Sequence, residues 1–168
     1  YEVFRTNKTS IDKKVGQELR VQYVLDLREF PGDPVMDVLT HDFEDILNDD
    51  EVKIVAEVMG GLHPAYEFTR RCLEAGKSVC TSNKELVAEH GAELIQIAKD
   101  HQVNYLFEAS VGGGIPIIRP LNSSLTADVI VEISGILNGT TNYMLTKMSR
   151  EGLNYDDVLK EAQAKGYA

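Results

Sequence analysis

Residues 107–145, FEASVGGGIPIIRPLNSSLTADVIVEISGILNGTTNYML, carry the features around which the rest of the chain is organised. The apolar run before them, residues 103–107, predicts a buried strand that ends at Glu108. Three glycines follow at 112–114, and glycine allows positive φ and a close approach of the backbone to a ligand. Glu108 and neighbouring carbonyl oxygens could therefore bind a hard cation. A flexible turn between a strand and a helix also explains the glycines.

Further along, residues 128–134, DVIVEIS, predict a second strand, and the run NGTTN at 138–142 precedes a helical pattern. Thr140 or Thr141 is the predicted cap of that helix, and the free amides at its start suit a carboxylate or a phosphate. A cap accounts for one threonine. Five small or polar residues are more than a cap requires, so this run is a candidate ligand site.

The composition restricts the class of protein. The 168 residues, 43% hydrophobic and 26% charged, are typical of one soluble globular domain. With 17 basic and 27 acidic residues, the net charge of −10 disfavours nucleic acid and anionic membranes as partners. No signal peptide or membrane-length apolar run is visible, which points to the cytoplasm. Cys72 and Cys80 are predicted to be buried thiols.

In the first two thirds of the chain, apolar runs alternate with helical patterns. Strands are predicted at 19–27, 53–58 and 77–81, and helices at 40–47, 64–75 and 86–101. This alternation predicts an α/β fold with a parallel sheet and right-handed crossovers. Ligands of such sheets bind beyond the carboxyl ends of the strands. Those ends are Asp26, residues 59–61, residues 81–84 and Glu108.

The first residues, YEVFR at 1–5, read as the interior of a helix that has no N-cap. In a dinucleotide-binding fold, a strand and a G-x-G-x-x-G turn precede such a helix, and the chain contains no such motif. We therefore expect a Rossmann-like parallel sheet that lacks its first strand. Because that strand is central in this topology, we also expect a gap in the sheet and exposed apolar neighbours.

Charged residues at the carboxyl edge of the predicted sheet are candidates for binding a coenzyme and a substrate. In dinucleotide-binding folds, an acidic residue at the end of the strand that corresponds to 19–27 binds the ribose hydroxyls of NAD. An arginine at that place accommodates the 2′-phosphate of NADP instead. The chain offers both Asp26 and Arg28, so the choice between NAD and NADP stays open. Lys84 stands at a helix start, where the helix dipole disfavours a cation. It is either a solvated lysine or one held to donate to a substrate oxygen or to nicotinamide.

Several motifs in order resemble homoserine dehydrogenase. They are VMGG at 58–61, TSNKELVAEHG at 81–91, EASVGGGIPIIRPL at 108–121 and GILNGTTNYMLTKM at 135–148, with EAQAKGYA at 161–168 after them. The resemblance implies NAD(P)-dependent, reversible interconversion of L-homoserine and L-aspartate 4-semialdehyde. That reaction belongs to threonine, methionine and isoleucine biosynthesis.

The resemblance also implies two domains. One is an NAD(P)-binding Rossmann-like domain over residues 1–118, and the other is the start of an α+β substrate and dimerisation domain over 119–168. Pro116 and Pro120 mark the predicted hinge between them. The 128–134 strand would lie at or near the interface of a homodimer or higher homo-oligomer. The family's main proton-donor lysine lies after the GYA sequence, so these residues alone are expected to be inactive.

Site residues are carried over by position. Lys84 matches a catalytic lysine of the family, and Met59 and Gly60 match the segment under the nicotinamide ribose. The implied homoserine site contains Gly139, Thr140 and Tyr167. A monovalent cation, typically sodium, is implied at the Glu108 side chain and at the main-chain oxygens of Val111, Gly113 and Ile115.

Two other hypotheses remain open. Another two-domain amino-acid dehydrogenase would explain the sheet and Lys84, although not the sequence GILNGTTNY. A non-catalytic module that senses a dinucleotide or an amino acid would bind ligand without turnover.

Overall fold

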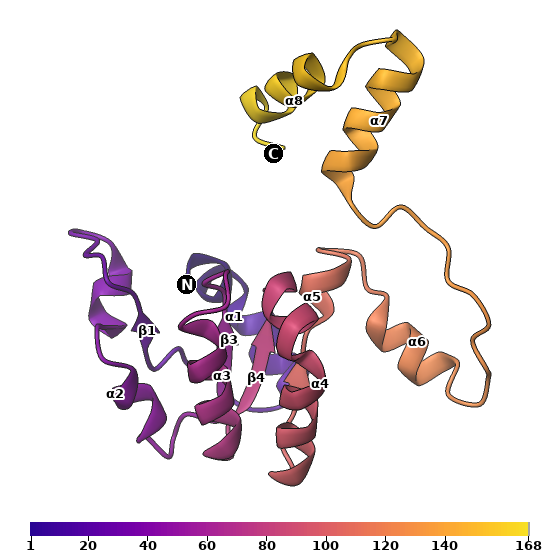
Figure 1. Ribbon diagram of the computed structural model, residues 1–168. Helices are drawn as coiled ribbons and strands as arrows, with labels where there is room; N and C mark the ends of the chain where they lie inside the picture. The colour runs from indigo at the N-terminus through magenta and orange to yellow at the C-terminus, as the bar shows by residue number, and fades with distance from the viewer. Residues whose placement is uncertain (168) are drawn as a thin grey trace. The chain divides into compact units, whose positions relative to one another are not determined.

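The computed structural model of the chain describes residues 1–167 (Figure 1). It divides into two compact units, Tyr1–Ser110 and Val111–Ala168, and each unit is described by itself. Among the described residues, no helix has both the length and the apolarity that crossing a bilayer requires.

The first unit alternates short strands with helices. Its elements in order are α1 (Glu2–Val15), β1 (Val24–Leu25), the 3₁₀ helix η1 (Pro34–Val38), β2 (Leu39–Thr40), α2 (Phe43–Leu47), β3 (Ile54–Glu57), α3 (Ala65–Glu74), β4 (Ser78–Thr81), α4 (Lys84–Asp100) and β5 (Tyr105–Leu106). A short helix, α5 (Glu108–Val111), leads into the second unit.

The strands form two separate parallel sheets. The larger sheet contains β3, β4 and β5 in that order, and the smaller one pairs β1 with β2. Helix α3 connects β3 to β4, and helix α4 connects β4 to β5. This arrangement confirms the predicted α/β class. The break between the two sheets corresponds to the expected gap.

The core of the first unit lies on one side of the larger sheet, where α3 and α4 pack (Figure 1). Leu73, Val79, Leu86 and Leu94 are almost completely buried there. Because successive residues of a strand point to opposite faces, each strand sends only alternate side chains into this core.

The opposite face of the larger sheet is open. Ile54 of β3 is 63% exposed and Leu106 of β5 is 50% exposed, so this face exposes apolar side chains on both edge strands of the sheet. Cys80 shares a row with Leu106 in the sheet register and is only partly buried. The prediction of two buried thiols is therefore right for Cys72 and wrong for Cys80.

The strand predicted at 19–27 is wrong for most of its length, because only β1 pairs with another strand. The backbone of Leu19 is held by side chains of α1 instead. Its amide donates to Asp12 Oδ1 at 2.8 Å, and its carbonyl accepts from Lys8 Nζ at 2.9 Å. These bonds satisfy backbone groups that a strand would have paired with a neighbouring strand.

The predicted helices of this unit are confirmed, with shifted starts. Helix α2 begins at Phe43, because Thr40 belongs to β2 and the side chain of Asp42 caps the helix. Helix α4 begins at Lys84, directly after its cap Asn83. Lys84 is thus the first residue of the longest helix in the described chain.

The second unit contains α6 (Ile118–Ser124), α7 (Gly139–Glu151) and α8 (Tyr155–Ala164). Met144, Val158 and Ala162 are buried between α7 and α8. The strand predicted at 128–134 is wrong, since these residues form neither helix nor strand. A strand needs a partner for its backbone groups, and no described strand pairs with this segment.

Candidate functional site

The carboxyl ends of β3 and β4 carry connected, buried polar groups. Glu57 ends β3 and Thr81 ends β4, and the two residues are partners in the sheet register. Thr81 Oγ1 donates a hydrogen bond to Glu57 Oε2 at 2.5 Å, and the amide of Met59 donates to Glu57 Oε1 at 2.7 Å. Hydrogen bonds to both oxygens offset the cost of burying a carboxylate.

The same network continues into the turn before α4. The amide of Asn83 donates to Thr81 Oγ1 at 2.9 Å, and its side-chain Nδ2 donates to the carbonyl of Gly61 at 2.6 Å. Its Oδ1 accepts from the amide of Leu86 at 3.1 Å, which caps α4. The loop after β3 and the turn after β4 are thereby tied to each other.

The loop after β3 presents backbone and two apolar side chains, Val58 and Met59, to solvent. Gly60 and Gly61 have φ values of 80° and 70°, a left-handed conformation that favours glycine. Met59 is 47% exposed. The predicted coenzyme residues Met59 and Gly60 thus lie on an accessible loop at the carboxyl edge of the sheet, where ligands of this fold class bind.

Lys84 stands at the same edge. It is exposed, and within residues 1–167 its side chain makes no hydrogen bond or ion pair. A cation in the first turn of a helix is disfavoured by the helix dipole, so Lys84 contributes nothing evident to the stability of α4. An unengaged ammonium group at the ligand edge is available to donate to a bound molecule.

Sequence patterns do not single out Glu57, Thr81 and Asn83 as a connected group, although they are buried and join the two loops. The one local signal is Glu57 itself, a charged residue within the apolar strand KIVAEV at 53–58. A carboxylate in a buried strand needs hydrogen-bond donors nearby, but the sequence does not identify which residues supply them.

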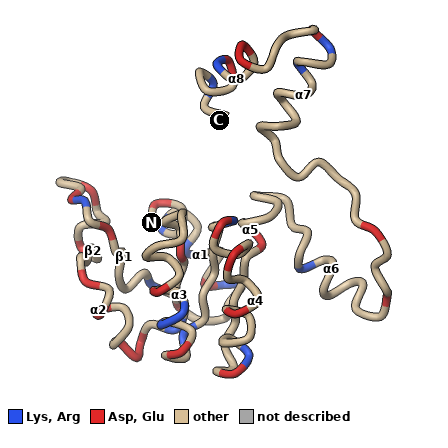
Figure 2. The backbone as a smooth tube through the Cα atoms, viewed as in Figure 1, with Lys and Arg blue, Asp and Glu red and all other residues tan. Residues whose placement is uncertain are grey.

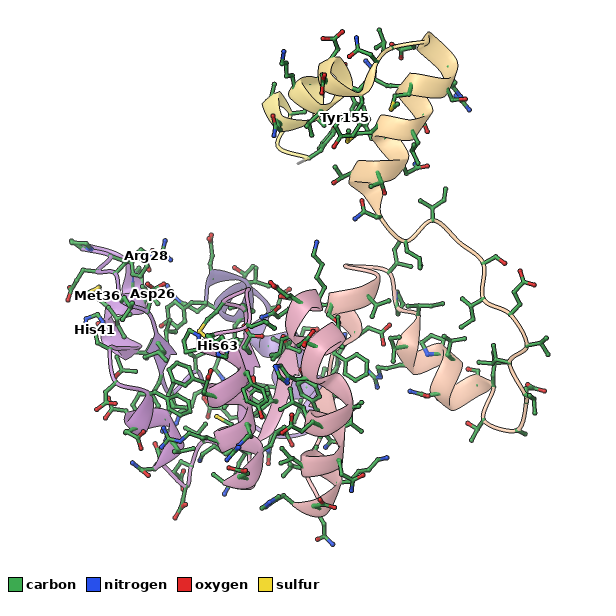
Figure 3. All side chains as sticks on the ribbon, in the orientation of Figure 1. Asp26, Arg28, Met36, His41, His63 and Tyr155 are labelled. Atoms are coloured by element: carbon green, nitrogen blue, oxygen red, sulfur yellow. The ribbon has the colours of Figure 1, made fainter. Side chains whose placement is uncertain are left out.

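A second predicted position, the end of β1, is occupied by an ion pair. Figure 3 labels Asp26 and Arg28 beside the β1 region. Arg28 holds both carboxylate oxygens of Asp26, through Nε to Oδ1 at 3.0 Å and Nη2 to Oδ2 at 2.8 Å. These hydrogen bonds hold the pKa of Asp26 well below its usual range. The Arg28 side chain remains 75% exposed, whereas that of Asp26 is 25% exposed.

His41 holds the same loop from the other side (Figure 3). Its Nδ1 lies 2.6 Å from the carbonyl oxygen of Asp26, and its Nε2 lies 3.2 Å from Glu29 Oε1. The bond to the Asp26 carbonyl, followed by the bond to Glu29, raises the pKa of His41. With both ring nitrogens protonated, His41 donates in both directions and fixes the backbone at Asp26.

An open cavity of about 510 Å³ lies next to Asp26. Its lining comes from the start of α1, from β1 and from the loop that follows, and includes Tyr1, Arg5, Val24, Asp26 and Phe30. Three of the lining residues, Glu2, Asp26 and Asp33, are acidic, and Arg5 is basic. Acidic residues also lie along α2, α3 and α4 (Figure 2).

In the second unit, Thr140 and Tyr167 meet. Gly139 and Thr140 begin α7, and Thr140 Oγ1 donates to the main-chain carbonyl of Tyr167. The predicted cap, Thr140 or Thr141, is wrong: Asn138 caps α7, and its Oδ1 accepts from the amide of Thr141 at 2.9 Å. Asparagine occupies the position because its side-chain oxygen reaches the third amide of the helix.

A charged cluster joins α7 to α8 behind these residues. Glu161 accepts from Lys147 at 2.7 Å, from Lys165 at 2.7 Å and from the hydroxyl of Tyr143 at 2.6 Å. These hydrogen bonds, with Lys147 first, lower the pKa of Glu161 to about 2. The ring of Tyr143 also meets the ring of Tyr167 edge-on, with centroids 5.2 Å apart.

The predicted cation ligands follow β5. Glu108 begins α5 and Val111 ends it, and Gly113 has a left-handed φ of 60°. The amide of Ile115 donates to the carbonyl of Gly112 at 3.0 Å, which closes a tight turn. A Cβ atom at Gly112 would collide with the carbonyl oxygen of Ile115. The donors are a carboxylate and main-chain carbonyls, hard oxygen ligands of the kind that alkali and alkaline-earth cations take.

Comparison with known proteins adds the following. Residues 11–108 match the family model described as homoserine dehydrogenase, NAD binding domain, and residues 116–168 match the model described as homoserine dehydrogenase. A homoserine dehydrogenase of Lactococcus lactis is 43% identical over 96% of this chain, and one of Neisseria gonorrhoeae is 41% identical over 99%. The chain spans 39% of the length of each of these relatives.

Solved structures that resemble this chain are also homoserine dehydrogenases. A homoserine dehydrogenase from Thiobacillus denitrificans superposes with a TM-score of 0.87 at 41% identity, over 99% of this chain and 39% of that one. A hyperthermophilic archaeal homoserine dehydrogenase in complex with NADPH superposes with a TM-score of 0.72 at 28% identity, over 96% of this chain and 46% of that one.

Proposed function

The chain belongs to the homoserine dehydrogenase family, and from that premise we propose that it contributes the coenzyme-binding edge and part of the substrate site of a homoserine dehydrogenase. The reaction is the interconversion of L-homoserine and L-aspartate 4-semialdehyde. Residues 1–118 are assigned to the coenzyme domain, and residues 119–168 to the start of the substrate and dimerisation domain.

One observation carries the proposal. At the carboxyl edge of β3 and β4, the exposed Met59–Gly60 loop and the unengaged Lys84 are tied together through Glu57, Thr81 and Asn83. This is the edge at which a parallel α/β sheet binds a dinucleotide. An exposed glycine loop suits the coenzyme, and a free ammonium group suits the substrate oxygen.

NAD(P), when bound, accepts or supplies the hydride. Lys84 would donate a hydrogen bond from Nζ to the substrate oxygen and so stabilise the negative charge that develops there. The loop at Met59 and Gly60 would support the nicotinamide ribose. In the second unit, the free amides at the start of α7, with Gly139, Thr140 and Tyr167, would hold the amino acid end of homoserine.

We further propose that the coenzyme site accepts NADP. Both oxygens of Asp26 are already engaged by Arg28, so this carboxylate is less available to ribose hydroxyls. The guanidinium of Arg28 is largely exposed at the end of β1, where a 2′-phosphate would lie. The bonds to Asp26 use Nε and Nη2 of Arg28, which leaves Nη1 to donate to a phosphate.

A monovalent cation, sodium in the proposal, would be held by the Glu108 carboxylate and the main-chain oxygens of Val111, Gly113 and Ile115. We also propose a cytoplasmic homodimer in which residues 128–134 lie at the interface. Their apolar side chains support this role, since Val129 is 88% exposed and Val131 is 94% exposed.

The test is homoserine oxidation by the protein translated from the complete reading frame that encodes this chain, with NAD and NADP in parallel. Production of reduced coenzyme with L-homoserine, and little with other amino alcohols, is the expected result. Coenzyme binding without turnover would instead favour the sensing module. Turnover of a different amino-acid alcohol would favour another dehydrogenase.

A further inference from the structure

Glu57 is a charged side chain that no contact with solvent explains. It is only 4% exposed, and its two network partners Thr81 and Asn83 are 5% and 6% exposed. Burying a carboxylate is costly unless its oxygens are hydrogen-bonded, and here each oxygen accepts one bond. Burial of this carboxylate at the ligand edge costs free energy, which favours a role of Glu57 other than packing.

The directions of the hydrogen bonds are fixed by chemistry. The Met59 amide can only donate, so Glu57 Oε1 accepts. Thr81 Oγ1 accepts from the amide of Asn83, and its single proton is then directed at Glu57 Oε2. Glu57 therefore acts as an acceptor twice in this network.

Packing does not hold the loop after β3 in place, whereas Leu86, two residues after Lys84, is fully buried in the core. Val58 is 75% exposed, Met59 is 47% exposed, and no atom lies within 4 Å of where a Cβ of Gly60 or Gly61 would be. On the other side, Lys84 has no side-chain partner among the described residues. The core fixes the start of α4, and the bonds through Glu57, Thr81 and Asn83 join the 59–61 loop to it.

We propose that Glu57 is a positioning residue that holds the 59–61 loop and the Lys84 turn at a fixed separation, so that the nicotinamide and the lysine are brought into register. The inference rests on the proposed function and deepens it, since Glu57 would touch neither coenzyme nor substrate. Misplacement of reacting groups by about 1 Å lowers rates by about 100-fold, so a small shift between these loops is enough to matter.

The kinetic test uses the protein from the complete reading frame and three variants. Glu57→Gln removes the charge and replaces one acceptor oxygen by an N–H donor, so the bond to Thr81 must reverse its direction. Thr81→Val removes the hydroxyl. Thr81→Ser keeps it. We expect Glu57→Gln and Thr81→Val to lower kcat by about 10- to 100-fold with coenzyme Kd changed less than about threefold. Thr81→Ser is expected to retain most of the activity.

Thr69→Val is the matched control. Thr69 is also buried, at 2% exposure, but its hydroxyl has no partner among the described residues. This variant makes the same chemical change away from the network and is expected to keep kcat. If Glu57→Gln does not fold, Thr81→Val carries the test, because it leaves the bond between Glu57 and Met59 in place.

A second readout separates positioning from loss of stability. Oxidation of L-homoserine deuterated at its hydroxyl-bearing carbon should show a larger isotope effect on kcat in Glu57→Gln and Thr81→Val than in the parent protein. A protein that is merely less stable keeps the parent's isotope effect per folded molecule. Unchanged kcat and isotope effect in both variants would overturn the inference.

Hydrogen exchange keeps the two proposals distinguishable. A parent protein that never oxidises homoserine refutes the proposed function, and the amide exchange of Thr81→Val then decides on Glu57. Faster exchange at Met59–Gly61 together with the first turn of α4 would support coupling of the two loops. Faster exchange confined to one of them would overturn it.

Discussion

Thr81 Oγ1 lies 2.5 Å from Glu57 Oε2, and this single side-chain hydrogen bond joins the carboxyl ends of two neighbouring parallel strands. The residues are 24 positions apart in sequence and share one row of the sheet. Because each is followed by a loop at the ligand edge, the bond couples the loop that carries Met59 to the turn that carries Lys84. The proposed chemistry depends on that coupling.

Arg28 should set the preference for NADP. Arg28→Ala removes the exposed guanidinium, so we expect kcat/KM with NADP to fall by about 10- to 100-fold, the worth of a charge-assisted bond. kcat/KM with NAD should stay within about threefold, because NAD has no 2′-phosphate. Steady-state kinetics with both coenzymes measure this. Arg70→Ala, which removes an ion pair to Glu74 on α3, is the control. Equal losses with NAD and NADP would refute the assignment.

Lys77 should stabilise the first unit through the backbone. It is 3% exposed, and its Nζ donates to the carbonyls of Asp49 at 2.7 Å and Val52 at 3.0 Å. Lys77→Met keeps the length of the side chain but removes both hydrogen bonds. We therefore expect the free energy of unfolding to fall by about 1–3 kcal/mol. Urea denaturation measures the change. Lys53→Met, at an exposed lysine nearby, should have little effect, and equal effects of the two variants would contradict this role.

Glu161 should make the packing of α7 on α8 sensitive to acid. Its folded pKa of about 2 lies below the ordinary value of 4.5, so the carboxylate stabilises the folded state above about pH 4.5. That contribution is lost as pH falls towards 2. The protection factor of the Tyr167 amide, whose N–H donates to the Ala162 carbonyl, should fall over this range.

Glu161→Gln should remove most of that pH dependence. Glu151→Gln is the matched control, because Glu151 pairs with the same Lys147 but only at 3.5 Å and with a side chain that is 51% exposed. An acid response that persists in Glu161→Gln and disappears in Glu151→Gln would show that the wrong carboxylate has been assigned.

Gly112 should be required for the proposed cation site. A Cβ atom there would collide with the carbonyl oxygen of Ile115, one of the proposed ligands. Gly112→Ala is therefore expected to weaken the dependence of activity on sodium, measured by titrating the cation against kcat. Gly114→Ala is the control, because a Cβ atom at Gly114 meets nothing within 4 Å. Identical sodium titrations for Gly112→Ala and the parent protein would count against this ligand set.

The order of elements in the first unit could be predicted because apolar periodicity is local. The strand KIVAEV and the helix capped by Asn83 are examples, and both are confirmed within a few residues. The strand predicted at 128–134 has the same alternation, yet it is not formed. Periodicity reports which face of a segment is apolar, whereas a strand also needs a partner, and the partner lies elsewhere in the chain.

The contacts of the site were harder to predict for the same reason. Glycines and Lys84 could be placed at the carboxyl edge from topology alone. The bond between Glu57 and Thr81 joins residues that are distant in sequence, and the pairing of Asp26 with Arg28 depends on side-chain rotamers. No local pattern determines which donor a buried carboxylate will meet.

The most direct test of the proposed active edge is kcat for homoserine oxidation by Lys84→Ala beside Lys99→Ala, in the protein from the complete reading frame. Lys84 and Lys99 lie in the first and last turns of α4, so both variants remove one exposed lysine from the same helix. We expect Lys84→Ala to lose about 100-fold or more and Lys99→Ala to lose less than about twofold. Comparable activity in the two variants would contradict a catalytic role for Lys84 and, with it, the proposed site.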